Sequence, residues 1–226
     1  LAAGEAEDAG RTLSEISEKN PHNREILLLV IDCYIESSNA AEAESKVIAL
    51  VELEPANYPK FLDLAQLYLN SDDLDGATRI LEMASEHLLV GGQAEDFRIL
   101  VSEALARDAG NIAALRLMTR FYSWNRDSEK LRDTLERLVS AANEREAVED
   151  ERYALSQLQK LVPHDIQIGK RLQQIDEENG FDSSYVEESL FDKQFLRNGE
   201  PAETAGADFA FAASDGSEAA RGSDMF

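Results

Sequence analysis

Within residues 1–180, apolar side chains recur at three- and four-residue steps, the spacing that places them on one face of an α-helix. Turn-forming residues such as Gly91, Gly92 and Pro163 interrupt these stretches at helical lengths. The periodic spacing ends at Phe195. We therefore expect residues 1–180 to be almost wholly helical and residues 197–226 to be irregular.

The helical pattern repeats with a 34-residue period, which also separates Pro21 from Pro55. Two stretches correspond position by position at this offset: Leu27, Val30, Ile31, Tyr34, Ala43, Val47 and Leu50 match Phe61, Leu64, Ala65, Tyr68, Ala77, Leu81 and Ala84. Self-similarity at this period is typical of stacked helix pairs, because each pair has an apolar face that only a neighbouring pair can cover. The pattern therefore predicts a solenoid that binds other molecules rather than a catalytic cavity.

These positions resemble the tetratricopeptide repeat family, whose pattern combines large apolar and small residues with a Tyr and a closing Pro at fixed places. Departures are Ile31 and Leu50, which are bulky where the family prefers small residues, and Leu89 in place of the closing proline. The resemblance implies an all-α, right-handed superhelical solenoid of antiparallel helix pairs over residues 1–180. Its parts are a half repeat over 1–23, repeats over 24–57 and 58–90, and a degenerate repeat over 111–144.

The degenerate repeat is displaced from the preceding one by a 54-residue offset, which relates Leu115 to Phe61. This offset exceeds the 34-residue period by the length of one helix with its turn. Either such a helix has been inserted, or one helix of a pair has been lost. The amphipathic stretch from Phe97 to Leu105 predicts an extra helix over 91–110. Further apolar stripes, stopped by Pro163 and by Gly180, predict terminal helices over 145–180.

Counting back from the first full repeat places Ala9, Leu13 and Ile16 in the second helix of an earlier repeat. The chain also begins with Leu1 rather than Met. We therefore expect it to be a fragment, or a processed product, of a longer protein with more repeats upstream.

Residues 181–226 form an acidic, low-complexity tail rich in Gly, Ala, Ser, Asp and Glu. Such a composition buries too little apolar surface to offset the entropy of ordering, which favours disorder. Ser184 and Glu187 have capping-box spacing, and the apolar residues up to Phe195 could share one helical face, so a short docking helix near 184–196 is the alternative.

The chain carries a formal charge of −23, with 45 acidic and 22 basic residues. Because this charge repels phosphate backbones, nucleic acid is not an expected partner. No apolar run approaches the roughly 20 residues of a membrane-spanning helix, and we expect a cytoplasmic protein. The lone Cys33 rules out a disulfide within the chain.

Few residues indicate chemistry. His22, His87 and His164 lie in separate segments, and none has a partner at the spacing of a helical metal site. The Gly91-Gly92 pair lacks the downstream Lys and Ser or Thr of a phosphate-binding loop. We expect neither an enzyme nor a cofactor.

The family resemblance implies which residues of each first helix line the concave surface. In the second repeat these are Leu62, Gln66, Leu69 and Asn70, and in the degenerate repeat they include Arg116, Arg120 and Trp124. The first repeat contributes Glu25, Leu28, Asp32, Ile35 and Glu36.

Arg116, Arg120 and Trp124 follow one another at four-residue steps and so share one helical face in an otherwise acidic chain. Two guanidinium groups beside an aromatic ring are suited to an acidic peptide that carries aromatic residues. The alternative is that both arginines pair with acids of the same chain.

Together these features predict a protein-interaction scaffold, or adaptor, that holds a peptide or partner segment in its groove. The alternative is a structural or assembly subunit packed permanently in a larger envelope, secretion or pilus-type complex. A mixed polar and apolar groove favours reversible peptide binding, whereas an extended apolar face favours a permanent interface.

The C-terminal tail is itself an acidic segment with aromatic residues, so tethering favours its binding to Arg116 and Arg120 until an external partner displaces it. A double Arg116→Glu, Arg120→Glu change should abolish partner and tail binding while the helices remain folded. Affinity measurements beside circular dichroism check this, and unchanged affinity in a folded variant would contradict it.

Overall fold

A computed structural model describes residues 3–181, and every regular element in that range is helical. The elements are α1 (Ala3–Lys19), α2 (Arg24–Glu36), α3 (Ala40–Leu53), the short 3₁₀ helix η1 (Pro55–Asn57), α4 (Lys60–Asn70), α5 (Leu74–Val90), α6 (Ala94–Arg107), α7 (Ile112–Trp124), α8 (Ser128–Glu144), α9 (Val148–Leu161) and α10 (Ile166–Asn179). The all-α prediction is confirmed. The expected disorder of residues 182–226 and the docking helix near 184–196 lie outside the described residues.

Polar side chains mark where most of these helices begin. Asn23, Asn39, Asp73, Asn111, Asp127 and Asp165 each accept a hydrogen bond from a backbone N–H in the first turn of the helix that follows. Such caps satisfy N–H groups that have no partner within the helix. The helices α4, α6 and α9 follow Pro59, Gln93 and Ala147 instead, which provide no side-chain cap.

Six turn residues take left-handed backbone angles, and their positions show how the helices are grouped. They are Ser38, Asp72, Gly92, Arg126, Glu146 and Gly180, with φ between 56° and 87°. From each member to the next, a 34-residue spacing alternates with a 20-residue spacing along the whole series. Every such residue therefore has a counterpart at a 54-residue offset, which indicates a backbone unit of three helices.

A second kind of turn has the same 54-residue spacing. Glu54 and Asp108 close α3 and α6 in an extended conformation, and Val162 closes α9 with φ −128° and ψ 69°. By this backbone pattern α3, α6 and α9 are counterparts, as are α4, α7 and α10. The helix expected as a single insertion at 91–110 is thus α6, a regular member of a series, while the boundaries of the individual repeats stay a prediction.

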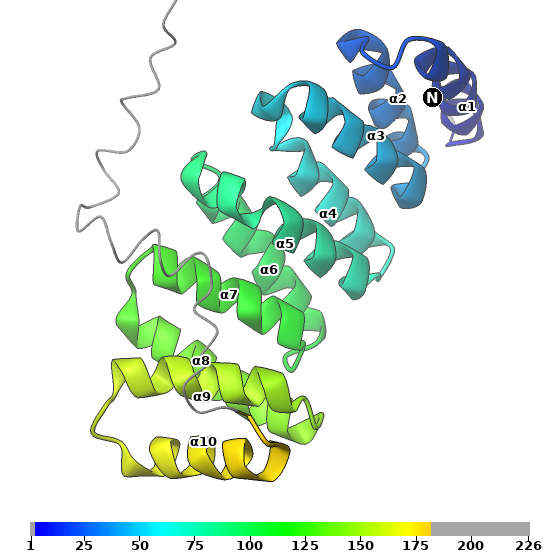
Figure 1. The fold of residues 1–226 in the computed structure, drawn as a ribbon. Coiled ribbons are helices and arrows are strands. Elements are labelled where there is room, and N and C mark those ends of the chain that lie inside the picture. Colours follow the sequence, from blue (N-terminus) through cyan, green and yellow to red (C-terminus); the bar gives the residue numbers. More distant parts are fainter. Residues whose placement is uncertain (1–2, 182–226) are drawn as a thin grey trace, which may run out of the picture. The chain divides into compact units, whose positions relative to one another are not determined.

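The helices pack as an antiparallel series, each against the next, and several also pack against the next but one (Figure 1). In one row α4 lies beside α2 and α6, and in the other α5 lies beside α7. Ion pairs connect further helices within the second row: Arg79 of α5 binds Glu44 of α3, and Arg116 of α7 binds Asp150 of α9. Even-numbered and odd-numbered helices therefore form two rows.

The core runs between the two rows. The residues that carry the 34-residue pattern are buried: Leu27, Val30, Ile31, Tyr34, Ala43, Val47 and Leu50 from the first repeat and Phe61, Leu64, Ala65, Tyr68, Ala77, Leu81 and Ala84 from the second. Phe97 of α6 has no exposed surface. Because burial of apolar surface is the main favourable contribution to folding, each helix depends on its neighbours for stability.

One polar cluster ties together three consecutive helices. The Tyr68 hydroxyl of α4 donates a hydrogen bond of 2.5 Å to the Glu44 carboxylate of α3, which also accepts two hydrogen bonds from Arg79 of α5. Hydrogen bonds from Arg79 lower the pKa of Glu44 despite its partial burial. Burial, together with the Glu44 carboxylate, raises the pKa of Tyr68 to about 12.

Replacing Glu44 by Gln should lower the free energy of unfolding at pH 7 by about 1 kcal/mol. The Glu44 carboxylate is mostly shielded from water, which strengthens its contacts, but Arg79 is half exposed, which limits the contribution of the ion pair. The folded pKa of Glu44 is lowered, so its stabilising contribution exists above the unfolded pKa of about 4.3 and is lost as pH falls through the folded value. Urea unfolding at several pH values checks this. Glu52→Gln, an exposed position of α3, is the matched control, and equal effects of the two changes would contradict the prediction.

Candidate functional site

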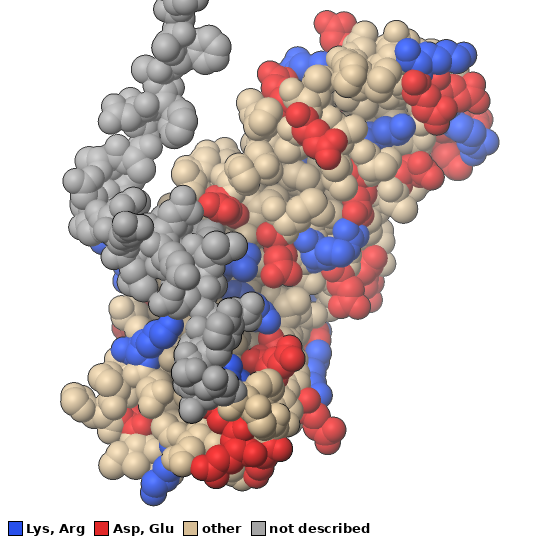
Figure 2. Space-filling model, viewed as in Figure 1, with Lys and Arg blue, Asp and Glu red and all other residues tan. Residues whose placement is uncertain are grey.

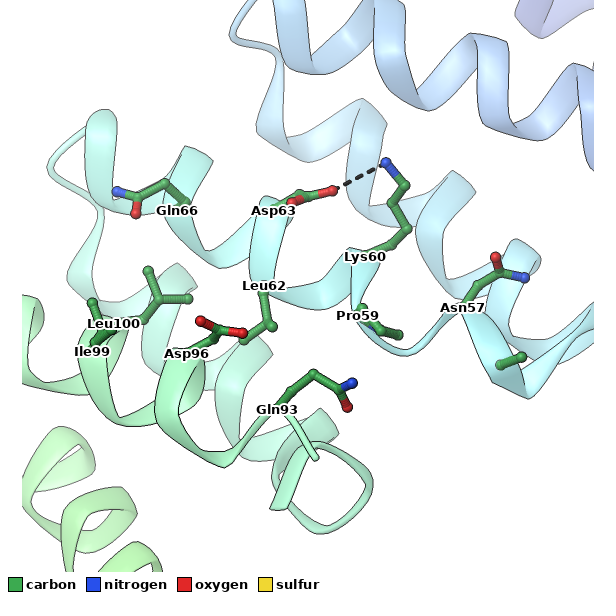
Figure 3. Close-up of a pocket in the computed structure, with 11 residues that line it drawn as sticks. Asn57, Pro59, Lys60, Leu62, Asp63, Gln66, Gln93, Asp96, Ile99 and Leu100 are labelled. Carbon is green, nitrogen blue, oxygen red and sulfur yellow. Dashed lines mark hydrogen bonds and ion pairs between the residues drawn. The ribbon is translucent and has the colours of Figure 1, made fainter. Parts of the chain in front are cut away.

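An open groove of about 700 Å³ lies between α4 and α6 (Figure 3). It is lined by Ala56, Asn57, Pro59, Lys60, Leu62, Asp63, Gln66, Gln93, Asp96, Ile99 and Leu100. The N-terminal halves of the two helices form its walls, and the segments that precede them close one end. Both walls come from the same row of helices, which is why segments far apart in the sequence face one another.

Aliphatic side chains form the apolar part of the groove. Ile99 is 49% exposed, Leu62 is half-buried and Leu100 is almost fully buried. An exposed isoleucine beside two leucines offers a surface for aliphatic side chains of a partner. Asn57, Gln66 and Gln93 add amide groups, which can donate and accept hydrogen bonds with a peptide backbone.

The single ammonium group among the residues that line the groove is already engaged. Lys60 Nζ lies 3.1 Å from Asp63 Oδ2 and 3.5 Å from Asp32 Oδ1 of α2. Burial disfavours its charge, but the hydrogen bonds and attraction of the two carboxylates outweigh burial and raise the pKa of Lys60. Gln66 Nε2 donates to Asn70 Oδ1 at 3.2 Å and to Glu103 Oε2 of α6 at 3.3 Å.

Of the four residues of α4 predicted to line the groove, two line it, one is exposed and one is buried. Leu62 and Gln66 line it, and Asn70 is exposed and accepts the hydrogen bond from Gln66. Leu69 has no exposed surface, so its side chain is part of the core and is not available to a partner. The prediction for Leu69 followed the family pattern, but the helix face it occupies is covered by neighbouring side chains.

The predicted basic and aromatic group lies on α7, in the other row. Arg116 Nη1 is 2.8 Å from Asp150 Oδ1, and its guanidinium lies 5.1 Å from the centre of the Tyr153 ring of α9. Arg120 Nη1 donates to Ser85 Oγ of α5 at 2.7 Å, and Nη2 lies 3.9 Å from Glu82. Both arginines thus have partners in the same chain, which was the alternative interpretation.

Trp124 is half-buried, with its ring centre 6.5 Å from that of Phe121. Because α7 lies beside α5 and α9, whereas α4 lies beside α2 and α6, the Arg116, Arg120 and Trp124 group does not share a groove with Leu62 and Gln66. The structure thus separates residues that the repeat pattern placed at equivalent positions.

Asp96, Ile99 and Leu100 were missed, because groove residues were assigned only to the first helix of each repeat and α6 was expected as an extra helix. The 54-residue offset would have indicated them. It relates Asp96 and Ile99 to Asp150 and Tyr153 of α9, and both of these contact the predicted Arg116.

Within residues 3–181, no three His, Cys, Asp or Glu side chains are grouped so that they could hold a metal ion. His87 stacks on Tyr58, with ring centres 3.8 Å apart, and His22 and His164 are exposed. Among the helices of this part of the chain, none is long and apolar enough to cross a membrane.

Two rows of stacked helices define a helical-repeat fold. Residues 1–59, which include α1 to α3, match the family model described as the tetratricopeptide repeat. This match supports the resemblance to the tetratricopeptide repeat family that the sequence pattern predicted, and such repeats generally mediate protein–protein interaction. No curated protein sequence matches the chain.

The contacts of the arginines change what the double variant should do. Arg116→Glu and Arg120→Glu would place carboxylates beside Asp150 and Glu82, so this variant should be less stable than the wild type by about 1 to 2 kcal/mol. Arg116→Gln with Arg120→Gln removes the charges without this repulsion and is the better test of peptide binding.

Thermal unfolding by circular dichroism compares the stability of the two variants, and fluorescence polarisation with a synthetic 181–195 peptide measures their binding. Equal melting temperatures for the Glu and Gln variants would contradict the assigned ion pairs. Unchanged peptide affinity in the Gln variant would count against a peptide site at these arginines.

Proposed function

We propose that the protein is a non-catalytic interaction scaffold that binds an extended segment of a partner protein in the groove between α4 and α6. The observation that carries the proposal is the exposed Ile99 and the half-buried Leu62 beside polar groups in an open groove of about 700 Å³. An apolar centre with a polar surround is the usual composition of a peptide-binding interface.

The composition of the groove supports reversible binding over the alternative of a permanently packed assembly subunit. Obligate interfaces are large and resemble a protein core, whereas this groove mixes two carboxylates, an ammonium and three amides with its aliphatic side chains. In the free protein these charged and amide groups remain in contact with water, so the open groove carries no free-energy cost of buried, unpaired polar groups.

Ile99→Asp should weaken peptide binding by about tenfold or more, because a charge would replace the exposed aliphatic contact in the middle of the groove. Met83→Asp is the matched control: Met83 is 47% exposed and lies on α5, outside the groove. Short random peptides displayed on phage and selected on the full chain provide the ligands, and fluorescence polarisation measures their affinity for each variant.

Both substitutions are at half-exposed helical positions, so circular dichroism should show similar folding for the two variants. If Ile99→Asp binds the selected peptides as tightly as Met83→Asp does, the groove is not the binding site.

A further inference from the structure

The three-helix backbone unit places a second copy of the groove positions on α7 and α9. At the 54-residue offset, Leu62, Asp96 and Ile99 of the α4–α6 groove correspond to Arg116, Asp150 and Tyr153 of α7 and α9. The turn residues on which this correspondence rests, such as Asp72 with Arg126 and Gly92 with Glu146, have the same left-handed conformation.

In the second copy the chain fills the site with its own guanidinium. Arg116 Nη1 donates to Asp150 Oδ1 at 2.8 Å, and the guanidinium carbon lies 5.1 Å from the centre of the Tyr153 ring. The Asp150 side chain is 22% exposed, so the contact is partly shielded from water. A planar cation held by a carboxylate and an aromatic face is a favourable arrangement for arginine.

In the first copy the same carboxylate has no such cation. Leu62 occupies the position of Arg116, and Asp96 lies opposite it across the groove (Figure 3). Among the described residues, none forms an ion pair or a hydrogen bond with the Asp96 side chain. The neighbouring Lys60 does not neutralise it, because its ammonium lies between Asp32 and Asp63.

We propose that the α4–α6 groove recognises a partner segment with an arginine or lysine flanked by aliphatic residues, and that Asp96 binds this cation as Asp150 binds Arg116. The proposal rests on the groove being the peptide site. It assigns the partner's aliphatic side chains to Leu62 and Ile99, and its backbone to the amides of Gln66 and Gln93.

The charge of the whole chain supports a cationic partner. With a formal charge of −23, the protein attracts basic segments at long range, and the association rate should fall as salt is added. On the face seen in Figure 2, acidic side chains are spread along the described helices, with basic side chains beside many of them. The carboxylate of Asp96 adds a specific contact at the groove to this general attraction.

The first test uses peptides selected from the phage-displayed library, each also synthesised with every Lys and Arg replaced by Gln. Asp96→Asn should weaken binding of the basic peptides by about tenfold and leave the Gln versions unchanged. Glu95→Gln is the matched control, since it removes the same charge from the same helical turn, where Glu95 pairs with Arg98 outside the groove.

A second variant tests the site by placing an arginine of the chain itself beside Asp96. Leu62→Arg places a guanidinium where the second copy has Arg116, so the variant should form an internal pair with Asp96 and lose binding of the basic peptides. Adding Asp96→Asn to it should lower its melting temperature, because the new internal pair is broken. A crystal structure of Leu62→Arg should show the guanidinium on Asp96.

Each outcome separates the two proposals. If Ile99→Asp abolishes binding but the selected peptides are not enriched in Lys or Arg, or Asp96→Asn and Glu95→Gln have equal effects, the groove binds peptides and the cation assignment is wrong. If Ile99→Asp leaves binding unchanged, the groove proposal is wrong. If the library yields no binder, both are overturned.

Discussion

None of the helices α1 to α10 can bury its apolar face alone, and the rest of the described structure follows from that constraint. Leu27, Leu64 and Phe97 are fully or almost fully buried although they lie on helices of only 11 to 14 residues. Isolated helices of that length are marginal in water, so packing against neighbours supplies most of their stability. The arrangement of these neighbours then decides which faces remain free to bind.

The odd number of helices in the backbone unit has a direct consequence for those free faces. Successive helices alternate between two rows. Because the unit contains three helices, a helix and its counterpart in the next unit lie in opposite rows. For this reason α4 packs beside α2 and α6, whereas its counterpart α7 packs beside α5 and α9. Equivalent positions such as Leu62 and Arg116 therefore lie between different pairs of helices, so Arg116 can pair with Asp150 while the α4–α6 groove stays open.

Each polar contact between helices of one row joins two residues that are about one helix pair apart in the sequence. Such a contact can form only when the helices are stacked. Arg79 with Glu44, Arg120 with Ser85 and Arg116 with Asp150 are 34 or 35 residues apart. Partly exposed ion pairs add little stability individually. Their main effect here is to engage basic side chains on an acidic protein, which leaves few cations available in the α4–α6 groove.

The sequence by itself determined the helical class, the repeating pattern and most of the core, because apolar periodicity and turn residues are local properties of the chain. The 34-residue pattern identified Leu27, Tyr34, Phe61 and Tyr68 as core positions, and all four are buried. It also identified Leu62 and Gln66 as groove residues. Tertiary structure alone decided the row of each helix, because that depends on how three-helix units alternate. It therefore decided that Leu69 is buried, that Arg116 and Arg120 are paired within the chain, and that Asp96 and Ile99 complete the groove.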